Sequence, residues 1–432
     1  MACRTDPNAM LTDAAGYAIT TNSRSTVEAV ETFTTELLSH GQRAAVIVAA
    51  AEADRTCALA QALTGALYLF LQTGEGLDRA APWLAAARET AVGATDRERM
   101  LIAALDAWHS RDDGRALTLH LEIARDWPRD LLNLKIAQIH QLNRGDRSGM
   151  RDLTTAAVGW NPGSGFAWGL HAFALEQAGD LAGAEAAGMK AVSMNADDPW
   201  AQHAVAHVRE ARGQAADGLA FLESMSPRWD RCSSFMYTHN WWHTALFRLS
   251  LGDAAGAIAL FDTRVWGVRK TYVQDQVNAV SLLARLELRG VDVGDRWQDV
   301  ADHVAPRIHD RLNAFHDLHT LYALARAGRV EAVAAMMEDM AGIDLPRLWR
   351  QVALPAARAL AAHAAQRWTA ATAIGSILPR LPLLGGSTAQ QDWFQQLHRH
   401  AVYRAAGEEG RRVFGYRSAT PAVPAVHALG GT

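Results

Sequence analysis

A short turn that contains glycine recurs along this chain at a nearly constant interval. The turns lie at Gly114, Gly145, Gly179, Gly213, Gly252 and Gly328. Successive intervals are 31, 34, 34, 39 and 76 residues, the last close to two periods. The segments between the turns are rich in alanine and place their apolar residues at helical spacing. A fixed period of this length predicts one supersecondary unit that is stacked many times.

The clearest unit runs from Phe166 to Pro199, FAWGLHAFALEQAGDLAGAEAAGMKAVSMNADDP, and predicts two helices joined by a Gly-Asp turn. Two helices and a tight turn in about 34 residues are typical of tetratricopeptide-type repeats. One hairpin cannot bury its apolar face alone, so neighbouring hairpins stack into a superhelix whose concave surface is made mainly by first helices. We therefore expect an all-α, tetratricopeptide-like helical-repeat superhelix (α-solenoid) with a helical C-terminal cap.

Changes in composition divide the chain into four expected regions. Residues 1–25 are polar and rich in turn formers, which indicates a loose N-terminal arm or cap. The helical pattern then extends over residues 26–378. A Pro- and Gly-rich interruption introduces a capping segment at residues 379–410, and residues 411–432 form a tail.

Composition excludes several classes of function. The net charge of -4 offers no basic stripe for a nucleic-acid backbone. The three cysteines, Cys3, Cys57 and Cys232, are too far apart for a thiolate zinc site or a disulfide framework, which favours a reducing compartment. No apolar run could cross a membrane, so we expect a soluble cytoplasmic protein. No phosphate-binding glycine motif is present, so no nucleotide cofactor is expected.

Two His-x-x-x-His pairs lie on successive first helices of the predicted array. They are His203/His207 and His239/His243. Four residues advance a helix by slightly more than one turn, so the imidazoles of each pair stack on one face. Glu210 follows His207 on the predicted concave surface. The spacing predicts that the two pairs converge, with His243 closer to the packing edge than the other three.

Five motifs occur in a fixed order along the chain: HAVAH from His203, HNWWH from His239, GDRWQDV, FHDLH and, near the C-terminus, GGSTAQQDWF. Together they resemble the tetratricopeptide repeat protein 38 family over roughly residues 30–410. The resemblance implies an all-helical repeat fold without an assigned activity. Within FHDLH it favours Asp317 and His319 as site residues, because His316 departs from the small polar residue more usual there.

Convergence of four imidazoles with Asp317 and His319 has three functional interpretations. A metal site fits because imidazole nitrogens bind Zn or Fe, with Glu210 or Asp317 as a further ligand, although the His-Glu-x-x-His motif is absent. Acid–base catalysis without metal is the second, and a ligand pocket without chemistry is the third. The structural alternative is that the histidines line a solvated groove or are packed between helices.

Aromatic and polar residues near these motifs suggest how a ligand would be held. Trp200 and Trp242 are expected to form rigid walls, with Trp242 facing the cavity. Ser387 and Gln390 are expected to fold back over the open end of the array as a lid, or to cap its last helix.

Two functional hypotheses from different classes follow. The first is an enzyme that binds and transforms a small organic molecule by hydrolase, lyase or isomerase chemistry rather than redox chemistry, using the six residues named above with or without a transition metal. The second is a scaffold that binds a peptide or protein partner in its groove. Exposed repeat edges also suggest a homodimer. Dense histidine and tryptophan favour the first hypothesis.

Overall fold

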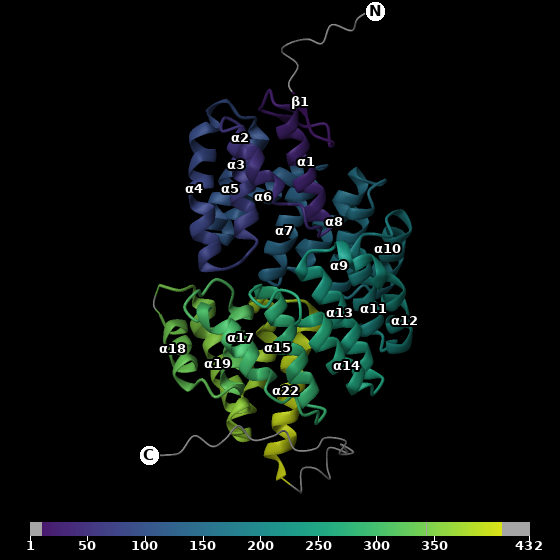
Figure 1. Cartoon of the computed structure of the whole chain (residues 1–432), viewed down its shortest axis with the longest axis vertical. Helices are drawn as coiled ribbons and strands as arrows, with labels where there is room; N and C mark the ends of the chain where they lie inside the picture. The colour runs from purple at the N-terminus through teal and green to yellow at the C-terminus, as the bar shows by residue number, and fades with distance from the viewer. Residues whose placement is uncertain (1–10, 343, 408–432) are drawn as a thin grey trace, which may run out of the picture.

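The chain folds into stacked helical hairpins, as a computed structural model of residues 11–342 and 344–407 shows (Figure 1). Within these ranges the only strands are β1 (Leu11–Thr12) and β2 (Ala18–Ile19), which pair antiparallel. The α-helices are α1 (Arg24–Leu38), α2 (Val46–Ala53), α3 (Ala58–Leu69), α4 (Gly74–Thr90), α5 (Asp96–His109), α6 (Asp113–Asp126), α7 (Leu131–Asn143), α8 (Arg147–Trp160), α9 (Gly165–Gln177), α10 (Leu181–Met194), α11 (Pro199–Ala211), α12 (Ala215–Met225), α13 (Ser234–Ser250), α14 (Ala254–Leu260), α15 (Val273–Glu287), α16 (Arg296–Val304), α17 (Ala314–Arg326), α18 (Val330–Met340), α19 (Leu354–Ala364), α20 (Trp368–Ala371), α21 (Ile374–Ile377) and α22 (Thr388–Ala405). Short 3₁₀ or π turns are η1 (Ala91–Gly93), η2 (Ser226–Arg231), η3 (Phe261–Val265), η4 (Ala305–Arg307), η5 (Trp349–Ala353) and η6 (Leu378–Leu384).

The recurring Gly-Asp dipeptide explains how each hairpin turns. Gly145 and Gly179 take φ values of +69° and +89°, a left-handed conformation that costs glycine little. The aspartate that follows each of them, Asp146 or Asp180, caps the next helix by accepting a hydrogen bond from a backbone N–H at 2.9 Å. Glycine therefore ends one helix and aspartate begins the next.

The prediction of a turn at Gly114 is wrong by three residues. Gly114 lies inside α6, and the left-handed position of that turn is taken by Arg111 with φ +64°. Arg111, Gly145, Gly179 and Gly213 are then spaced by 34 residues throughout. The irregular first interval in the sequence arose because a non-glycine residue occupies the turn.

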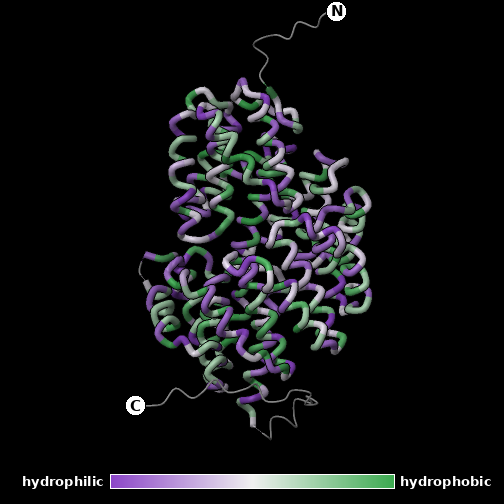
Figure 2. The backbone as a smooth tube through the Cα atoms, in the orientation of Figure 1, coloured by the Kyte–Doolittle hydropathy of each residue, from purple (hydrophilic) through white to green (hydrophobic). Residues whose placement is uncertain are grey.

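First helices of successive hairpins pack side by side along the array, as α9, α11, α13, α15, α17 and α19 do (Figure 1). Their partners α10, α12, α14, α16 and α18 follow each first helix in the chain and pack beside it. This is the all-α helical-repeat superhelix that the period predicts. Apolar and polar stretches alternate along the helices (Figure 2), and within the described residues no helix has the length and hydrophobicity needed to span a bilayer.

The N-terminal segment packs on the array rather than standing free from residue 11 onward. Ile19 is fully buried, and both the backbone N–H and the hydroxyl of Thr20 donate hydrogen bonds to the Glu98 carboxylate, at 2.9 and 2.6 Å. The first helix begins at Arg24. Residues 1–10 of the expected arm lie outside the described residues, as does the expected tail, 411–432.

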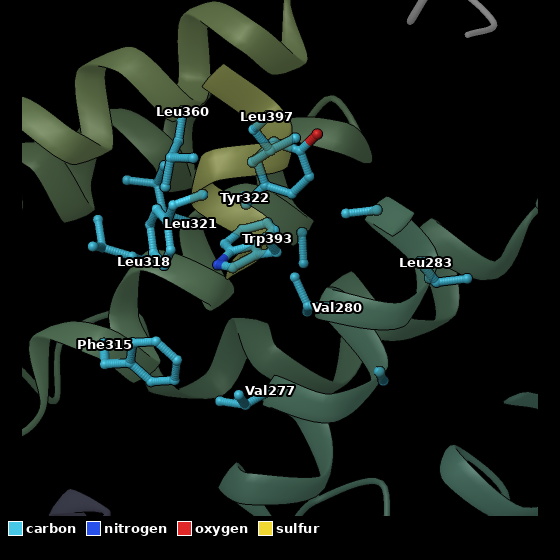
Figure 3. Close-up of a cluster of buried hydrophobic side chains, with 14 of the residues drawn as sticks. Val277, Val280, Leu283, Phe315, Leu318, Leu321, Tyr322, Leu360, Trp393 and Leu397 are labelled. Carbon is cyan, nitrogen blue, oxygen red and sulfur yellow. The ribbon is translucent and has the colours of Figure 1, made fainter. Parts of the chain in front are cut away.

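The C-terminal segment is helical, and α22 is part of the core. Trp393 and Leu397 of α22 pack among Val280 of α15 and Leu321 of α17 (Figure 3). Arg285 of α15 donates a hydrogen bond to the α22 backbone at Ala389 O, 2.9 Å away. The segment thus joins the repeats that surround it.

Residues far apart in the sequence close the superhelix on itself. Gly74 N donates to Asp310 Oδ2 at 3.0 Å, and Arg111 Nη2 donates to the Arg311 carbonyl at 2.6 Å. At the first residue of α22, Thr388 N donates to Gln177 Oε1 at 3.2 Å. Repeats that are distant in the sequence are therefore in contact.

Close packing between first and second helices predicts opposite effects for two glycine substitutions. A Cβ on the buried Gly218 would lie 2.4 Å from the Phe247 ring, whereas a Cβ on Gly159 of α8 would meet nothing within 4 Å. We expect Gly218→Ala to lower the free energy of unfolding by about 1–3 kcal/mol. The control Gly159→Ala should raise it by about 0.5 kcal/mol through helix propensity. Urea denaturation of both variants measures this, and equal effects would contradict the packing.

Burial of His120 predicts that the folded protein loses stability in acid. Burial lowers the pKa of His120 to about 4, while its Nδ1 lies 2.7 Å from Asn133 Oδ1. Between pH 6.5 and 4 the unfolded chain therefore binds a proton that the folded chain does not. Stability from this group is complete above pH 6.5 and falls by about 2 kcal/mol at pH 5.

The His120→Gln variant removes this titration. We expect the loss in unfolding free energy between pH 7.5 and pH 5 to be smaller in the variant than in the wild type by about 2 kcal/mol. Urea midpoints at the two pH values give the comparison. An unchanged difference would mean that His120 does not titrate on unfolding.

Candidate metal centre

Two adjacent first helices supply the four motif histidines. Helix α11 begins with Pro199 at its first position, after Asp198, whose carboxylate accepts hydrogen bonds from the N–H groups of Trp200 and Ala201 at 2.9 and 3.3 Å. This cap fixes where α11 starts and so which face its histidines occupy. Helix α13 lies beside α11 and presents its own pair at the same i, i+4 spacing.

The four imidazoles converge on one point. Nε2 of His203 lies 3.0 Å from Nε2 of His239 and 2.9 Å from Nε2 of His207. The His243 ring centre is 4.7 Å from that of His207 and 4.9 Å from that of His239. One nitrogen from each residue can be chosen so that all four lie within 4.8 Å of one another.

All four side chains are withdrawn from solvent. The histidines are 0–2% exposed, and His243 is the most buried of them. His243, which was expected closer to the packing edge than the other three, is fully buried, and its ring lies against those of His203, His207 and His239. The four residues do not line an open groove.

In three of the four imidazoles, Nδ1, the nitrogen on the outer side of the cluster, lies next to an oxygen atom. Nδ1 of His243 lies 3.1 Å from Glu210 Oε2, and Nδ1 of His207 lies 3.2 Å from Glu176 Oε2. Carboxylate oxygens accept hydrogen bonds, so they favour a hydrogen on each Nδ1 and leave the lone pair on Nε2. The Nε2 atoms are the ones that face the centre.

The third outer contact uses an amide. Nδ1 of His239 lies 2.8 Å from Asn278 Oδ1, and Asn278 Nδ2 donates to Thr238 Oγ1 at 3.3 Å, which sets the amide orientation. His239 therefore also directs an Nε2 lone pair inward. Nδ1 of His203 is buried without a hydrogen-bond partner. A hydrogen on His203 Nε2 can be donated to only one of its two neighbours, so the lone pair of the other neighbour has no donor at His203.

Burial and mutual repulsion keep most of the cluster neutral. Burial, followed by the other three histidines, holds the pKa of His203 far below its usual value, and burial lowers the pKa of His239 to about 3. Burial also opposes a proton on His207, but the Glu176 charge outweighs it and raises the pKa of His207. Burial raises the pKa of Glu210 to about 7. Neutral imidazoles are the form that binds metal ions.

Aromatic rings enclose the imidazoles. Trp242 stacks on His239 with ring centres 5.2 Å apart and planes 10° apart, and Phe235 stacks on the same ring at 5.3 Å. The ring of Trp200 lies 4.8 Å from that of His203. Trp242 is fully buried and packs on the histidines, and the expectation that it forms the wall of a ligand cavity stays a prediction.

The structure places the other predicted site residues elsewhere. His319 stacks on Trp393 at 4.6 Å and its Nδ1 contacts the Phe315 carbonyl at 2.8 Å, so it packs between α17 and α22. Asp317 forms a buried ion pair with Arg311. Among the described hydrogen bonds, ion pairs and ring contacts, none joins either residue to the four histidines. Asp317 and His319 project from α17, which is separated from α13 by α15.

Ser387 and Gln390 begin a helix. The Ser387 hydroxyl accepts a hydrogen bond from Gln390 N, and Gln390 Oε1 accepts one from Ser387 N at 2.9 Å, which together form a capping box for α22. The pair therefore starts α22, and its expected role over the open end of the array, as a lid or a cap, stays a prediction.

Sequence reasoning missed Glu176 and Asn278, both of which contact the histidines. Glu176 lies three residues before the turn at Gly179, and Glu210 lies three residues before the turn at Gly213. The two carboxylates thus occupy the same register of consecutive repeats, which is a signal the sequence contains. Asn278 lies on α15, and no motif marks it.

Comparison with known proteins adds little detail. No protein-family model matches the sequence. A tetratricopeptide repeat protein from Parabacteroides merdae is similar to this chain in structure, with 14% identity over 61% of this chain and 93% of that one and a TM-score of 0.39. The tetratricopeptide-like fold class is shown by the helical hairpins themselves. Membership of the tetratricopeptide repeat protein 38 family stays a prediction.

The contact between Glu210 and His243 predicts that the Glu210 carboxylate contributes to metal affinity. If Glu210 orients His243 for a metal ion, Glu210→Gln should weaken Zn²⁺ binding by about 10–100-fold while the fold is kept. The matched control is Glu287→Gln, which removes a buried carboxylate that pairs with Arg326 instead. Competition with a chromophoric chelator measures both affinities. Equal affinities for the wild type and Glu210→Gln would contradict this role.

Proposed function

We propose that this helical-repeat protein binds a divalent transition metal ion, Zn²⁺ or Fe²⁺, through His203, His207, His239 and His243. The observation that carries the proposal is the convergence of four buried imidazoles, three of which turn Nδ1 outward to an oxygen atom. A cation between the Nε2 atoms would replace the repulsion of facing lone pairs with four coordinate bonds.

The distances support this assignment. Metal–nitrogen bonds of about 2.0–2.1 Å in a tetrahedron place the nitrogens about 3.3–3.4 Å apart. The nitrogen–nitrogen distances in the cluster begin at 2.9 Å and do not exceed 4.8 Å. Small side-chain rotations that move each ring nitrogen by less than about 1 Å would bring the four nitrogens to this geometry. Imidazole donors suit Zn and Fe, whereas Mg and Ca prefer oxygen ligands.

Catalysis on a small organic molecule is a more specific hypothesis, and it stays a prediction. It requires an imidazole or a coordination position that a substrate can reach. The group that supports this hypothesis is the carboxylate of Glu210. It contacts His243, and the Glu210 side chain is 26% exposed to solvent. The alternative, a scaffold that binds a peptide or protein, rests on the helical-repeat fold and needs no metal.

Metal analysis tests the proposal directly. We expect the full chain, purified without chelator from medium supplemented with zinc and iron, to contain about one transition-metal ion per chain. After removal of that ion, Zn²⁺ at about 100 times its Kd should raise the free energy of unfolding by about 2.7 kcal/mol. His243→Ala should lose both the metal and this stabilisation.

His120→Gln is the matched control, because it alters another buried histidine far along the chain from the cluster. It should keep the metal content of the wild type. Elemental analysis and thermal denaturation give the two readouts. A wild-type chain that binds neither Zn²⁺ nor Fe²⁺ would refute the proposal, and the histidines would then be packing residues.

A further inference from the structure

The four-histidine cluster also shows which kind of metal centre it would form. We infer that the centre is closed and structural: four histidines complete the coordination of a divalent ion, and the ion joins consecutive repeats instead of activating a substrate. This inference rests on the proposed metal binding. It concerns what the bound ion does, so it can fail while metal binding stands.

The first argument is that all four protein ligands are nitrogen atoms and all are buried. Catalytic zinc centres keep one position for water or substrate, usually with three protein ligands, whereas structural centres take all four ligands from the protein. Here the four rings come from two helices and surround one point, with exposures of 0–2%. The His243 Nε2 atom is itself buried and has no other hydrogen-bond partner.

The second argument is that the surrounding groups leave the centre without a further ligand. Phe173 lies 5.5 Å from His203 and 5.6 Å from His207, ring centre to ring centre, and Trp242 lies edge-on to His243 at 4.7 Å. These apolar rings cannot coordinate a metal. The nearby carboxylates face Nδ1 atoms on the outer side of the rings, so they orient the ligands and do not occupy a coordination position.

The third argument is electrostatic. Glu176 contacts His207, and Glu210 contacts His243. Two carboxylates offset the charge of one divalent ion, which lowers the cost of burying that ion in an apolar surrounding. Arg285, which lies over Trp242 at 5.4 Å, has Asp392 3.8 Å away.

The fourth argument is the origin of the residues. Glu176 comes from α9, the four histidines from α11 and α13, and Asn278 from α15. These are the first helices of four consecutive hairpins, and each packs on the next. A metal ion at this point would tie all four together, half-way along the array. In a repeat protein each unit contacts mainly its neighbours, so one ion at such a junction couples units that otherwise unfold separately.

Cobalt substitution of the full chain tests the coordination. The metal is removed with a chelator and replaced by Co²⁺, and the visible spectrum is recorded with and without azide. We expect the intense bands of four-coordinate Co²⁺, and we expect them to remain unchanged in azide, because a closed centre has no position for the anion. Weak six-coordinate bands, or bands that shift in azide, would overturn the inference while metal binding stands.

Hydrogen exchange of the same samples tests the structural role. Removal of the metal should speed exchange in peptides from α9, α11, α13 and α15, and should leave peptides from α3 and α4, outside the junction, unchanged. Exchange that differs only around the histidines themselves would overturn the tie between repeats. Failure of the chain to bind Co²⁺ or Zn²⁺ at all would instead refute the proposed function.

Discussion

Contact between successive hairpins is the interaction on which this structure depends. A single hairpin has one apolar face and no partner for it, so its stability comes from the hairpin before and the hairpin after. The turn chemistry makes the stacking regular, because glycine ends one helix and aspartate caps the next. Regular stacking in turn places residues of equal register next to each other, as Glu176 and Glu210 are placed beside the histidines of the following helices.

The histidine cluster is built on this regularity and departs from it. Buried polar side chains in a repeat array are usually satisfied by hydrogen bonds, and the outer nitrogens of His239 and His243 follow that rule, while that of His207 lies 3.2 Å from the Glu176 carboxylate. Nδ1 of His203 and Nε2 of His243 are buried without a hydrogen-bond partner. An arrangement that turns three outer nitrogens toward oxygen atoms and brings the inner ones together is what a cation requires of its ligands.

The curvature of the array has a second consequence. Because the C-terminal helix α22 packs within the repeats, the concave side is lined in part by the chain itself. Arg285 links the two, since it contacts Trp242 beneath the cluster and the backbone of Ala389 in α22. A groove for a peptide would have to lie on the surface that α22 leaves free.

The sequence alone determined the helical class, the period and the pairing of histidines on two adjacent first helices, because these follow from local spacing and turn chemistry. It marked a helical C-terminal segment, but it did not identify Ser387 and Gln390 as the capping box that begins α22. Local spacing could not separate Asp317 and His319 from the cluster, because their distance from it depends on how many repeats intervene and how the array bends. Only tertiary packing decided that His243 and Trp242 are buried and that Asn278 contacts Nδ1 of His239, since burial and such contacts depend on neighbours that are distant in the sequence.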